Sequence, residues 1–401
     1  MAGLLLVGAG GLLVLLAWPG EKRALTEELP AIVPTGPTTE PIVPTRTPAR
    51  GAAMPTPAVA ATPVALSTAP LPTVTGTLQV TLLPHQQEPG LLERTRFLEW
   101  LERPRWGVGV GTGPISRYQV GSLRLGWYLD WQAQLAPLRP EGAAYAQMIR
   151  LREGVLSPGT GEIAAIARAN PGSLWLVGNE PDVKWQDNVE PATYARLYHD
   201  AYSAIKSADP TALVAIGGVS QPTPLRLRYL DMVLGAYQTQ FGAEMEVDVW
   251  NAHNFILREE RGSWGVDIPP GMPDDRGVLY EIEDGGSLEI FRQQIVDLRQ
   301  WMAQRGYQDR PLVVSEYGIL MPADYGFPPE RVADFLTGTF DIFMTAADPA
   351  LGYPEDDYRL VQSWCWYSLD APADYYPTGN LFDPQTGAMT PVGEVWSRYV
   401  E

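Results

Sequence analysis

Between residues 106 and 369, short apolar runs of strand length alternate with longer amphipathic segments. This alternation restricts the fold strongly, because strands separated by helices form parallel sheets. The apolar runs are rich in Val, Leu, Ile, Trp and Tyr, which favour strands. Eight of them are expected to be strands: 106–112, 123–130, 145–151, 174–179, 212–218, 247–253, 311–317 and 363–369.

Amphipathic helices are predicted between these strands. Apolar residues recur three or four positions apart over 194–205 and over 288–302, which is the spacing of one helix face. Ser287 is a suitable N-cap for the second of these helices, and Gly306 is a suitable stop signal after it. Strands and helices that alternate in this way predict an α/β chain folded as a (β/α)8 TIM barrel.

A doubly wound open sheet is the competing architecture. Its dinucleotide-binding form carries a G-x-G-x-x-G turn directly after a strand. The glycines of GVGVGTG at 107–113 do not have that spacing. We therefore favour the barrel and expect no cofactor.

The N-terminal 89 residues differ from the rest of the chain in composition. Residues 3–18 form an apolar run that is short for a transmembrane helix, and we expect 1–27 to be a signal peptide or a membrane anchor. Residues 28–89 are rich in Pro, Thr and Ala without periodicity, which predicts a disordered linker. Residues 90–401 are expected to form one folded domain, secreted or anchored at a membrane or cell surface.

Composition excludes several classes of function. The formal charge of −18 and the pI near 4.6 argue against nucleic-acid binding, because phosphates would repel such a surface. The single cysteine, Cys365, cannot form an internal disulfide framework or a cysteine-rich metal site. The three histidines form no H-E-x-x-H motif, and the chain has no G-x-S-x-G sequence. We therefore expect neither a metal centre nor a serine nucleophile.

Two glutamates interrupt strongly apolar runs at predicted strand ends. Glu180 follows 174–179 in WLVGNEPD, and Glu316 lies near the end of the run PLVVSEYG. Asn, Pro and Asp are turn formers, so WLVGNEPD is also typical of a strand that meets a turn. In a TIM barrel, however, the C-terminal ends of the strands carry the active site. A carboxylate in apolar surroundings is costly without a partner or a function, so the pair favours catalysis over two unrelated salt bridges.

The chain resembles glycoside hydrolases of clan A over roughly residues 105–396. The segments that carry this resemblance are LGWYLDW, YAQMIRL, WLVGNEPD, VDVWNAHNF, RPLVVSEYG and the C-terminal GNLFDPQTGAMTPVGEVW. In that clan Asn-Glu closes the fourth strand and a second Glu closes the seventh. The order and spacing of N-E-P, H-x-F and S-E-Y-G are similar to the group known as the glycosyl hydrolase catalytic core, which includes β-1,3-glucanases.

The resemblance implies that two carboxylates hydrolyse an O-glycosidic bond with retention of configuration. Glu316 would be the ionised nucleophile, and Glu180 would be the general acid and then the general base. Glu180 is expected to keep its proton near neutral pH because of the charge on Glu316 and partial burial. The two carboxyl groups should lie about 5–5.5 Å apart, against about 6.5–9.5 Å in an inverting enzyme.

The same resemblance implies sugar-binding roles for other residues at strand ends. Asn179 would donate a hydrogen bond to the 2-hydroxyl of the sugar, or would instead bond the backbone of its own turn. His253 closes the sixth strand, where clan members often have His-x-Tyr. Here Phe255 replaces the tyrosine that commonly orients the nucleophile, and Tyr317 and Tyr128 are candidate substitutes.

Aromatic side chains are expected to form the sugar-binding surface. Trp366, on the eighth strand, is expected to stack on the sugar at the cleaved bond. Core packing is the alternative for Trp364, its neighbour but one, because alternate residues share one face. Trp127, Tyr128 and Trp131 are expected to form further subsites.

Arg150, on the third strand, is expected either to pair with Glu316 or to form an ordinary ion pair inside the barrel. The segment 256–286 is a long loop after the sixth strand, and we expect it to wall one side of a cleft. The expected partner is a polysaccharide or oligosaccharide with β linkages, bound by a monomer. The alternative function is a carbohydrate-binding cell-envelope protein of weak or no catalytic activity on the same barrel.

Overall fold

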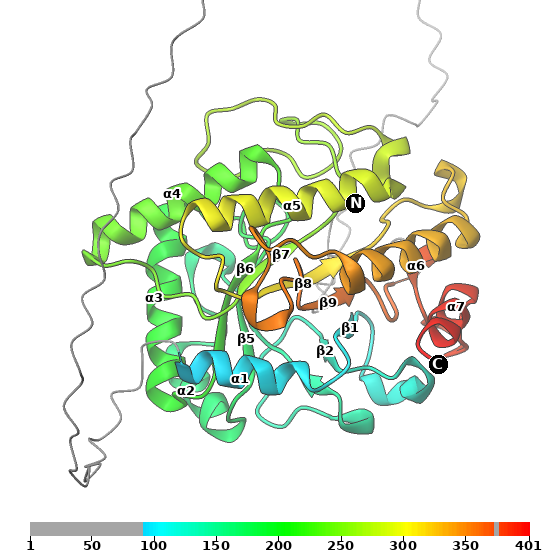
Figure 1. The fold of residues 1–401 in the computed structure, drawn as a ribbon, viewed down its shortest axis with the longest axis horizontal. Helices are drawn as coiled ribbons and strands as arrows, with labels where there is room; N and C mark the ends of the chain where they lie inside the picture. Colours follow the sequence, from blue (N-terminus) through cyan, green and yellow to red (C-terminus); the bar gives the residue numbers. More distant parts are fainter. Residues whose placement is uncertain (1–90, 373–376) are drawn as a thin grey trace, which may run out of the picture. The chain divides into compact units, whose positions relative to one another are not determined.

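The computed structural model describes residues 91–372 and 377–401 (Figure 1). The expected signal or anchor segment at 1–27 and the expected linker at 28–89 lie outside these residues. Within the described part of the chain, no helix combines the length and the apolar character needed to cross a membrane. The described domain begins with the helix α1, Leu91–Leu101.

Each of the predicted strand segments contains or overlaps a strand. The third segment, 145–151, overlaps two short strands that are separated by one residue. The strands are β1 (Trp106–Gly109), β2 (Trp127–Leu129), β3 (Ala144–Tyr145), β4 (Gln147–Ile149), β5 (Leu174–Asn179), β6 (Leu213–Gly218), β7 (Trp250–His253), β8 (Leu312–Tyr317) and β9 (Ser363–Trp366).

The strands pair in parallel and form two sheets. One sheet has six strands in the order β3-β2-β1-β9-β8-β7, and the other has three in the order β4-β5-β6. Because β1 pairs with both β2 and β9, the first and last strands of the chain are neighbours. Two isolated parallel bridges, Ala215–Val249 and Val219–Ala252, join the β6 and β7 segments. The prediction of an α/β fold with parallel strands is confirmed.

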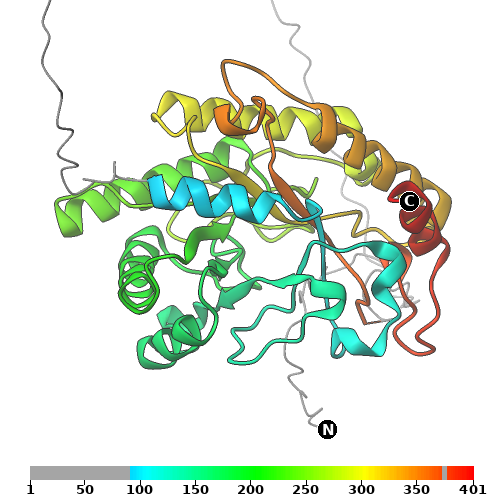
Figure 2. The same ribbon diagram turned by 60° about the horizontal axis from the view of Figure 1, so that its bottom comes forward.

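Helices surround the strands on the outside of the domain (Figures 1 and 2). The helices that follow α1 are α2 (Thr160–Ala169), α3 (Pro191–Ala208), α4 (Pro224–Phe241), α5 (Leu288–Gln304), α6 (Pro329–Thr345) and α7 (Pro391–Tyr399). The predicted helical segments 194–205 and 288–302 lie within α3 and α5. The Ser287 side chain accepts a hydrogen bond from the backbone N–H of Ile290 at 3.3 Å, which confirms it as the N-cap. Gly306 follows the end of α5 with φ of +79°.

A layer of aromatic rings joins the strands to these helices. Tyr317 of β8 packs against Phe291 of α5 and Phe343 of α6, with ring centroids 5.5 and 5.1 Å apart. Trp364 of β9 stacks on Phe343 at 4.8 Å. Successive residues of a strand point to opposite faces, so Glu316 is directed away from this layer.

The segment between β7 and α5 is a long loop, as predicted. It contains one isolated antiparallel bridge, Glu260–Arg276, and the short 3-10 helix Ile282–Gly286. Because parallel strands end on the same side, this loop begins beside the loops that follow β5, β6 and β8. The fold thereby brings Glu180, His253 and Glu316 to one end of the strands.

Candidate active site

Glu180 directly follows β5, and its backbone is in the left-handed region with φ of +42°. A residue with a side chain costs about 1–2 kcal/mol in this conformation, so the surrounding structure must hold it there. The Glu180 N–H donates to the carbonyl of Gly218 at the end of β6, at 3.0 Å. The Asn179 N–H donates to Asp187 Oδ2 at 2.8 Å. The turn is therefore fastened both to the next strand and to its own loop.

Glu180, His253 and Glu316 meet at the C-terminal ends of β5, β7 and β8. His253 Nδ1 is 2.9 Å from Glu180 Oε1, and His253 Nε2 is 3.5 Å from Glu316 Oε1. One side-chain atom of each residue lies within 4.8 Å of the other two. All three residues are at most 1% exposed. The imidazole thus lies between two buried carboxyl groups. We assign no metal ion to these three residues, because His253 Nδ1 already contacts Glu180.

Trp131 donates a short hydrogen bond to Glu316. Its indole Nε1–H lies 2.6 Å from Glu316 Oε1, and the residue is buried. Trp131 lies two residues beyond β2 in the left-handed region, with φ of +59°. The sequence led us to expect only a subsite wall here. No motif indicated this contact, because it joins two residues from distant parts of the chain.

Burial and four neighbouring side chains set the protonation of Glu316. Burial raises its pKa to about 7; His253, the Trp131 hydrogen bond and Arg150 lower it, whereas Glu180 raises it. Burial lowers the pKa of His253, but Glu316 and Glu180 outweigh this effect and raise it above the ordinary value. The expected ionisation of Glu316 at neutral pH stays a prediction, and burial brings the pKa of this carboxyl group close to neutrality. The sequence did not reveal how completely the fold buries this carboxyl group.

Gln186 connects Asn179 with Arg150 beside Glu180. Its Oε1 accepts hydrogen bonds from Asn179 Nδ2 at 3.3 Å and from the Arg150 guanidinium at 3.0 Å. Arg150 Nε forms an ion pair with Asp187 at 2.8 Å. Of the two alternatives for Arg150, the structure therefore has the interior ion pair and not a pair with Glu316. No sequence motif singled out Gln186.

Three aromatic residues expected at the substrate lie in the core instead. Trp127 packs against Trp100 of α1, with ring centroids 5.9 Å apart. Trp366 packs edge-on against Tyr317 at 5.2 Å, within the layer between strands and helices. All three are 0% exposed, so the substrate-binding roles expected for Trp127, Trp366 and Tyr317 are wrong. The cause is strand alternation, which turns these rings toward the helices.

Tyr367 is the aromatic residue after β9 that reaches the site. Its ring centroid lies 5.8 Å from that of Trp131 and 6.4 Å from that of Phe255. Phe255 packs edge-on against the His253 ring at 6.0 Å. The sequence did not indicate Tyr367. Tyr367 and Trp366 are adjacent aromatic residues at the end of β9, and only the structure shows which of them packs against Trp131.

Tyr128 lines a cavity of about 330 Å³ together with Asp130, Gln132 and Gln134. Its hydroxyl donates to the Leu138 carbonyl at 2.8 Å, so it is not the phenol that orients Glu316. A second cavity of about 400 Å³ is lined by Trp131 and Arg150 among others. Polar groups that line concave surfaces suit a hydroxyl-rich ligand, and the subsite role of Tyr128 stays a prediction.

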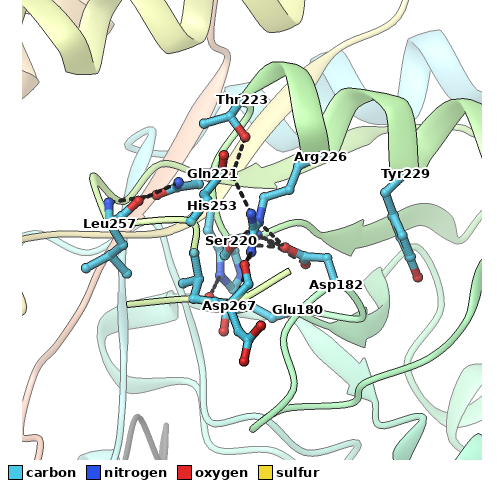
Figure 3. Close-up of polar contacts among 12 residues, drawn as sticks. Glu180, Asp182, Ser220, Gln221, Thr223, Arg226, Tyr229, His253, Leu257 and Asp267 are labelled. Atoms are coloured by element: carbon cyan, nitrogen blue, oxygen red, sulfur yellow. Dashed lines mark hydrogen bonds and ion pairs between the residues drawn. The ribbon is translucent and has the colours of Figure 1, made fainter. Parts of the chain in front are cut away.

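A fully buried arginine supports the turn that carries Glu180. Arg226 of α4 donates from Nε to Asp182 Oδ2 and to Ser220 Oγ, both at 2.6 Å (Figure 3). A terminal nitrogen of Arg226 donates to Glu259. Asp182 lies two residues after Glu180, and its carboxylate also accepts from the Ser220 N–H and hydroxyl. Arg226 thereby joins the loops after β5, β6 and β7.

The same arginine anchors the long loop after β7. Arg226 also donates to the carbonyls of Val266 at 3.1 Å and Asp267 at 3.2 Å. Gln221 forms two hydrogen bonds with the backbone of Leu257, each 2.8 Å long (Figure 3). The loop is therefore fixed at several points to the segment that connects β6 with α4. The sequence did not single out Arg226, since its position in a helix carries no motif.

No family model matches this chain, and no curated protein matches it. Solved structures resemble it at low sequence identity. An endo-β-1,3-glucanase of GH128 subgroup I from Amycolatopsis mediterranei, in complex with laminaritriose, is 17% identical over 74% of this chain and 99% of that chain, with a TM-score of 0.50. A subgroup II endo-β-1,3-glucanase from Pseudomonas viridiflava is 15% identical over 74% and 97% of the respective chains, also with a TM-score of 0.50.

At this identity the likeness concerns the fold alone. It agrees with the resemblance to β-1,3-glucanases that the strand-end motifs indicated. The chain shares its fold with GH128 endo-β-1,3-glucanases.

Proposed function

We propose that this protein is a retaining glycoside hydrolase that cleaves a β-1,3-linked glucan, on strands that close into a (β/α)8 barrel. The observation that carries the proposal is the group of Glu180, His253 and Glu316 at the ends of three parallel strands. The fold shared with GH128 endo-β-1,3-glucanases supports the choice of glycan. The pairing of β1 with β9 supports closure of the barrel.

The proposed reaction has two steps. In the first, Glu316 attacks the anomeric carbon while Glu180 gives its proton to the oxygen of the leaving sugar, and the glycosidic bond breaks. In the second, Glu180 takes a proton from water, whose oxygen attacks the same carbon and releases Glu316. One oxygen atom of Glu180 lies within 4.8 Å of one oxygen atom of Glu316, and this close approach supports the route. An inverting enzyme needs about 6.5–9.5 Å to hold a water molecule between them.

Buried polar atoms at the site support a hydroxyl-rich ligand. Within the described residues, five side-chain atoms there are buried without a hydrogen-bond partner: Asn179 Oδ1, Glu180 Oε2, Gln186 Nε2, His253 Nε2 and Glu316 Oε2. Each such atom costs about 1–3 kcal/mol, which a bound sugar would offset through its hydroxyl groups. The expected contact of Asn179 with the 2-hydroxyl remains part of this proposal.

A second candidate function is carbohydrate binding with little or no hydrolysis. Phe255 in place of a tyrosine and the near-complete burial of Glu180 and Glu316 favour it, because a substrate must reach both carboxyl groups. For either function we propose a monomer that is secreted or held at the cell surface through its N-terminus. The apolar run at 3–18 and the Pro-rich segment after it support this location.

The test is incubation of the protein with laminarin and with a β-1,4-glucan. We expect reducing ends to appear from laminarin, and the sugar first released should have the β configuration by proton NMR. Release of the α anomer first would refute the retaining mechanism. Binding of laminarin without cleavage would favour the second candidate function.

Glu180→Gln is expected to lower kcat/KM for laminarin by about 10²–10⁴-fold, because the amide has no proton to give to the leaving oxygen. The loss should be much smaller on an aryl glucoside whose leaving group needs no proton. Glu355→Gln, at an exposed position, serves as the control and should retain wild-type rates. Equal losses on both substrates would contradict the acid role of Glu180.

The acidic limb of the pH profile of kcat/KM for glycan hydrolysis is expected to have its midpoint near pH 7. Glu316 must be ionised to attack, and burial raises its pKa to about 7. Below that pH, kcat/KM should fall about tenfold for each pH unit. The measurement is kcat/KM on laminarin from pH 5 to pH 9 at constant ionic strength. A midpoint of the acidic limb near pH 4.5 would show that the fold does not shift the pKa of Glu316.

A further inference from the structure

We propose that Trp131 is a positioning residue whose indole N–H holds Glu316 and favours its ionised form, in place of the hydroxyl that Phe255 lacks. The proposal rests on the function proposed above for Glu316. It assigns to Trp131 a task that acts through another side chain, and it explains how the nucleophile is oriented without a tyrosine at position 255.

The hydrogen bond itself is the first support. Glu316 Oε1 lies 2.6 Å from the indole nitrogen of Trp131 and 3.5 Å from His253 Nε2, so the indole is the closer donor. A hydrogen bond from an N–H to a carboxylate is charge-assisted and is stronger than one between neutral groups. In a buried site, where water does not compete, such a bond also fixes the orientation of the carboxylate.

The backbone around Trp131 is shaped to make this contact. Its φ of +59° places a bulky residue in the left-handed region, which the surrounding structure must hold. Gly109 of β1 leaves room for the ring, since a Cβ at this position would lie only 2.7 Å from the indole. Tyr367 packs edge-on against the indole, with ring centroids 5.8 Å apart. The indole is therefore enclosed in a position that its own conformational preference would not select.

The hydroxyl groups that were candidates for this task lie elsewhere. Phe255 has none, and the Tyr128 hydroxyl donates to the backbone of Leu138. The Tyr317 ring lies in the aromatic layer between strands and helices. Trp131 is consequently the side chain that takes over the donor role.

Several charged or titratable groups act on Glu316 together with this bond. They are Glu180 after β5, His253 of β7 and Arg150 beside β4. Burial raises the pKa of the Cys365 thiol of β9, and Glu316 raises it further. Burial raises the pKa of Glu316, whereas the indole lowers it because the donor stabilises the carboxylate. Loss of the donor should therefore leave the other influences in place and move the titration of Glu316 to higher pH.

Trp131→Phe tests this directly, because it keeps an aromatic ring and removes the N–H. We expect the acidic limb of the kcat/KM profile on laminarin to move up by about 1–2 pH units. Trp106→Phe is the matched control. Trp106 is the first residue of β1, and its indole donates to the backbone carbonyls of Leu123 and Arg124. The control should retain the wild-type limb, and an unmoved limb in Trp131→Phe would overturn the proposal.

A measurement without substrate separates this proposal from the proposed function. In protein labelled with ¹⁵N-tryptophan, one indole N–H resonance should titrate with a midpoint near pH 7, and the titration should vanish in Glu316→Gln. This comparison needs no Trp131 variant, so it holds even when Trp131→Phe does not fold. Absence of a titrating indole would refute the hydrogen bond. A titrating indole in a protein that cleaves no glycan would support the bond and refute the proposed hydrolase.

Discussion

Glu316→Gln is expected to lower kcat/KM for laminarin by on the order of 10⁴-fold or more, because the neutral amide cannot attack the anomeric carbon. Glu180 and His253 remain in place in this variant, so the loss reports the nucleophile alone. Release of reducing ends measures the effect, and Glu355→Gln again serves as the exposed control. Hydrolysis at the wild-type rate would remove Glu316 from the mechanism.

The same substitution is expected to stabilise the folded protein above neutral pH. Burial raises the pKa of Glu316 from its ordinary 4.5 to about 7 in the folded state. The folded protein therefore holds this proton more tightly than the unfolded chain. The resulting stabilisation is fully present below pH 4.5 and is lost as the pH rises through 7. As the pH rises above 7, the wild type therefore loses about 3 kcal/mol of unfolding free energy that Glu316→Gln keeps.

Urea denaturation at pH 4.5 and at pH 8 measures this effect. The free energy of unfolding of Glu316→Gln, relative to wild type, should increase between the two pH values, whereas Glu355→Gln should follow wild type at both. A variant that is inactive and yet more stable at pH 8 also excludes misfolding as the cause of the lost activity. A constant difference between wild type and Glu316→Gln would show that the fold does not perturb this carboxyl group.

Arg226→Met is expected to lower the free energy of unfolding by about 3–5 kcal/mol. The arginine is completely buried, and its removal leaves the carboxylates of Asp182 and Glu259 without their cation. Methionine fills similar apolar volume, so the loss reports mainly the uncompensated charges. Chemical denaturation at pH 7 measures the change. The variant should also lose glycan hydrolysis, because Asp182 belongs to the turn that carries Glu180.

Arg228→Met, on the same helix, is the matched control. Arg228 pairs with Asp274 at the surface, where its side chain is 51% exposed. Such pairs contribute about 0–1 kcal/mol because water and salt screen them. Similar losses of stability in Arg226→Met and Arg228→Met would contradict the role assigned to the buried network.

The regular elements of the fold were accessible from the sequence. The segment 174–179 coincides with β5, and 311–317 differs from β8 by one residue. Val, Leu and Trp at successive positions leave little alternative to a buried strand between helices. The predicted segments 123–130 and 247–253 are longer than β2 and β7. The residues beside these two strands have a strand-like sequence pattern but are not part of the sheet.

Part of the candidate site followed from the same pattern. Glu180, His253 and Glu316 each stand at or directly after the end of an apolar run, and parallel strands bring such ends together. The orientation of the aromatic residues did not follow. Trp366 and Tyr367 are adjacent in sequence, yet one packs toward the helices and the other toward the carboxylates. The register of the strand end decides which way each ring points, and this orientation cannot be read from the amino-acid composition.

Apolar periodicity is a local property of the chain, so it was enough to identify residues at the strand ends. What those residues contact depends on the folded structure. The Trp131–Glu316 hydrogen bond, the arginine beneath the Glu180 turn and the raised pKa of Glu316 all depend on groups brought together from distant segments. Burial and long-range contacts arise from the packing of all the elements at once, and no local pattern encodes them.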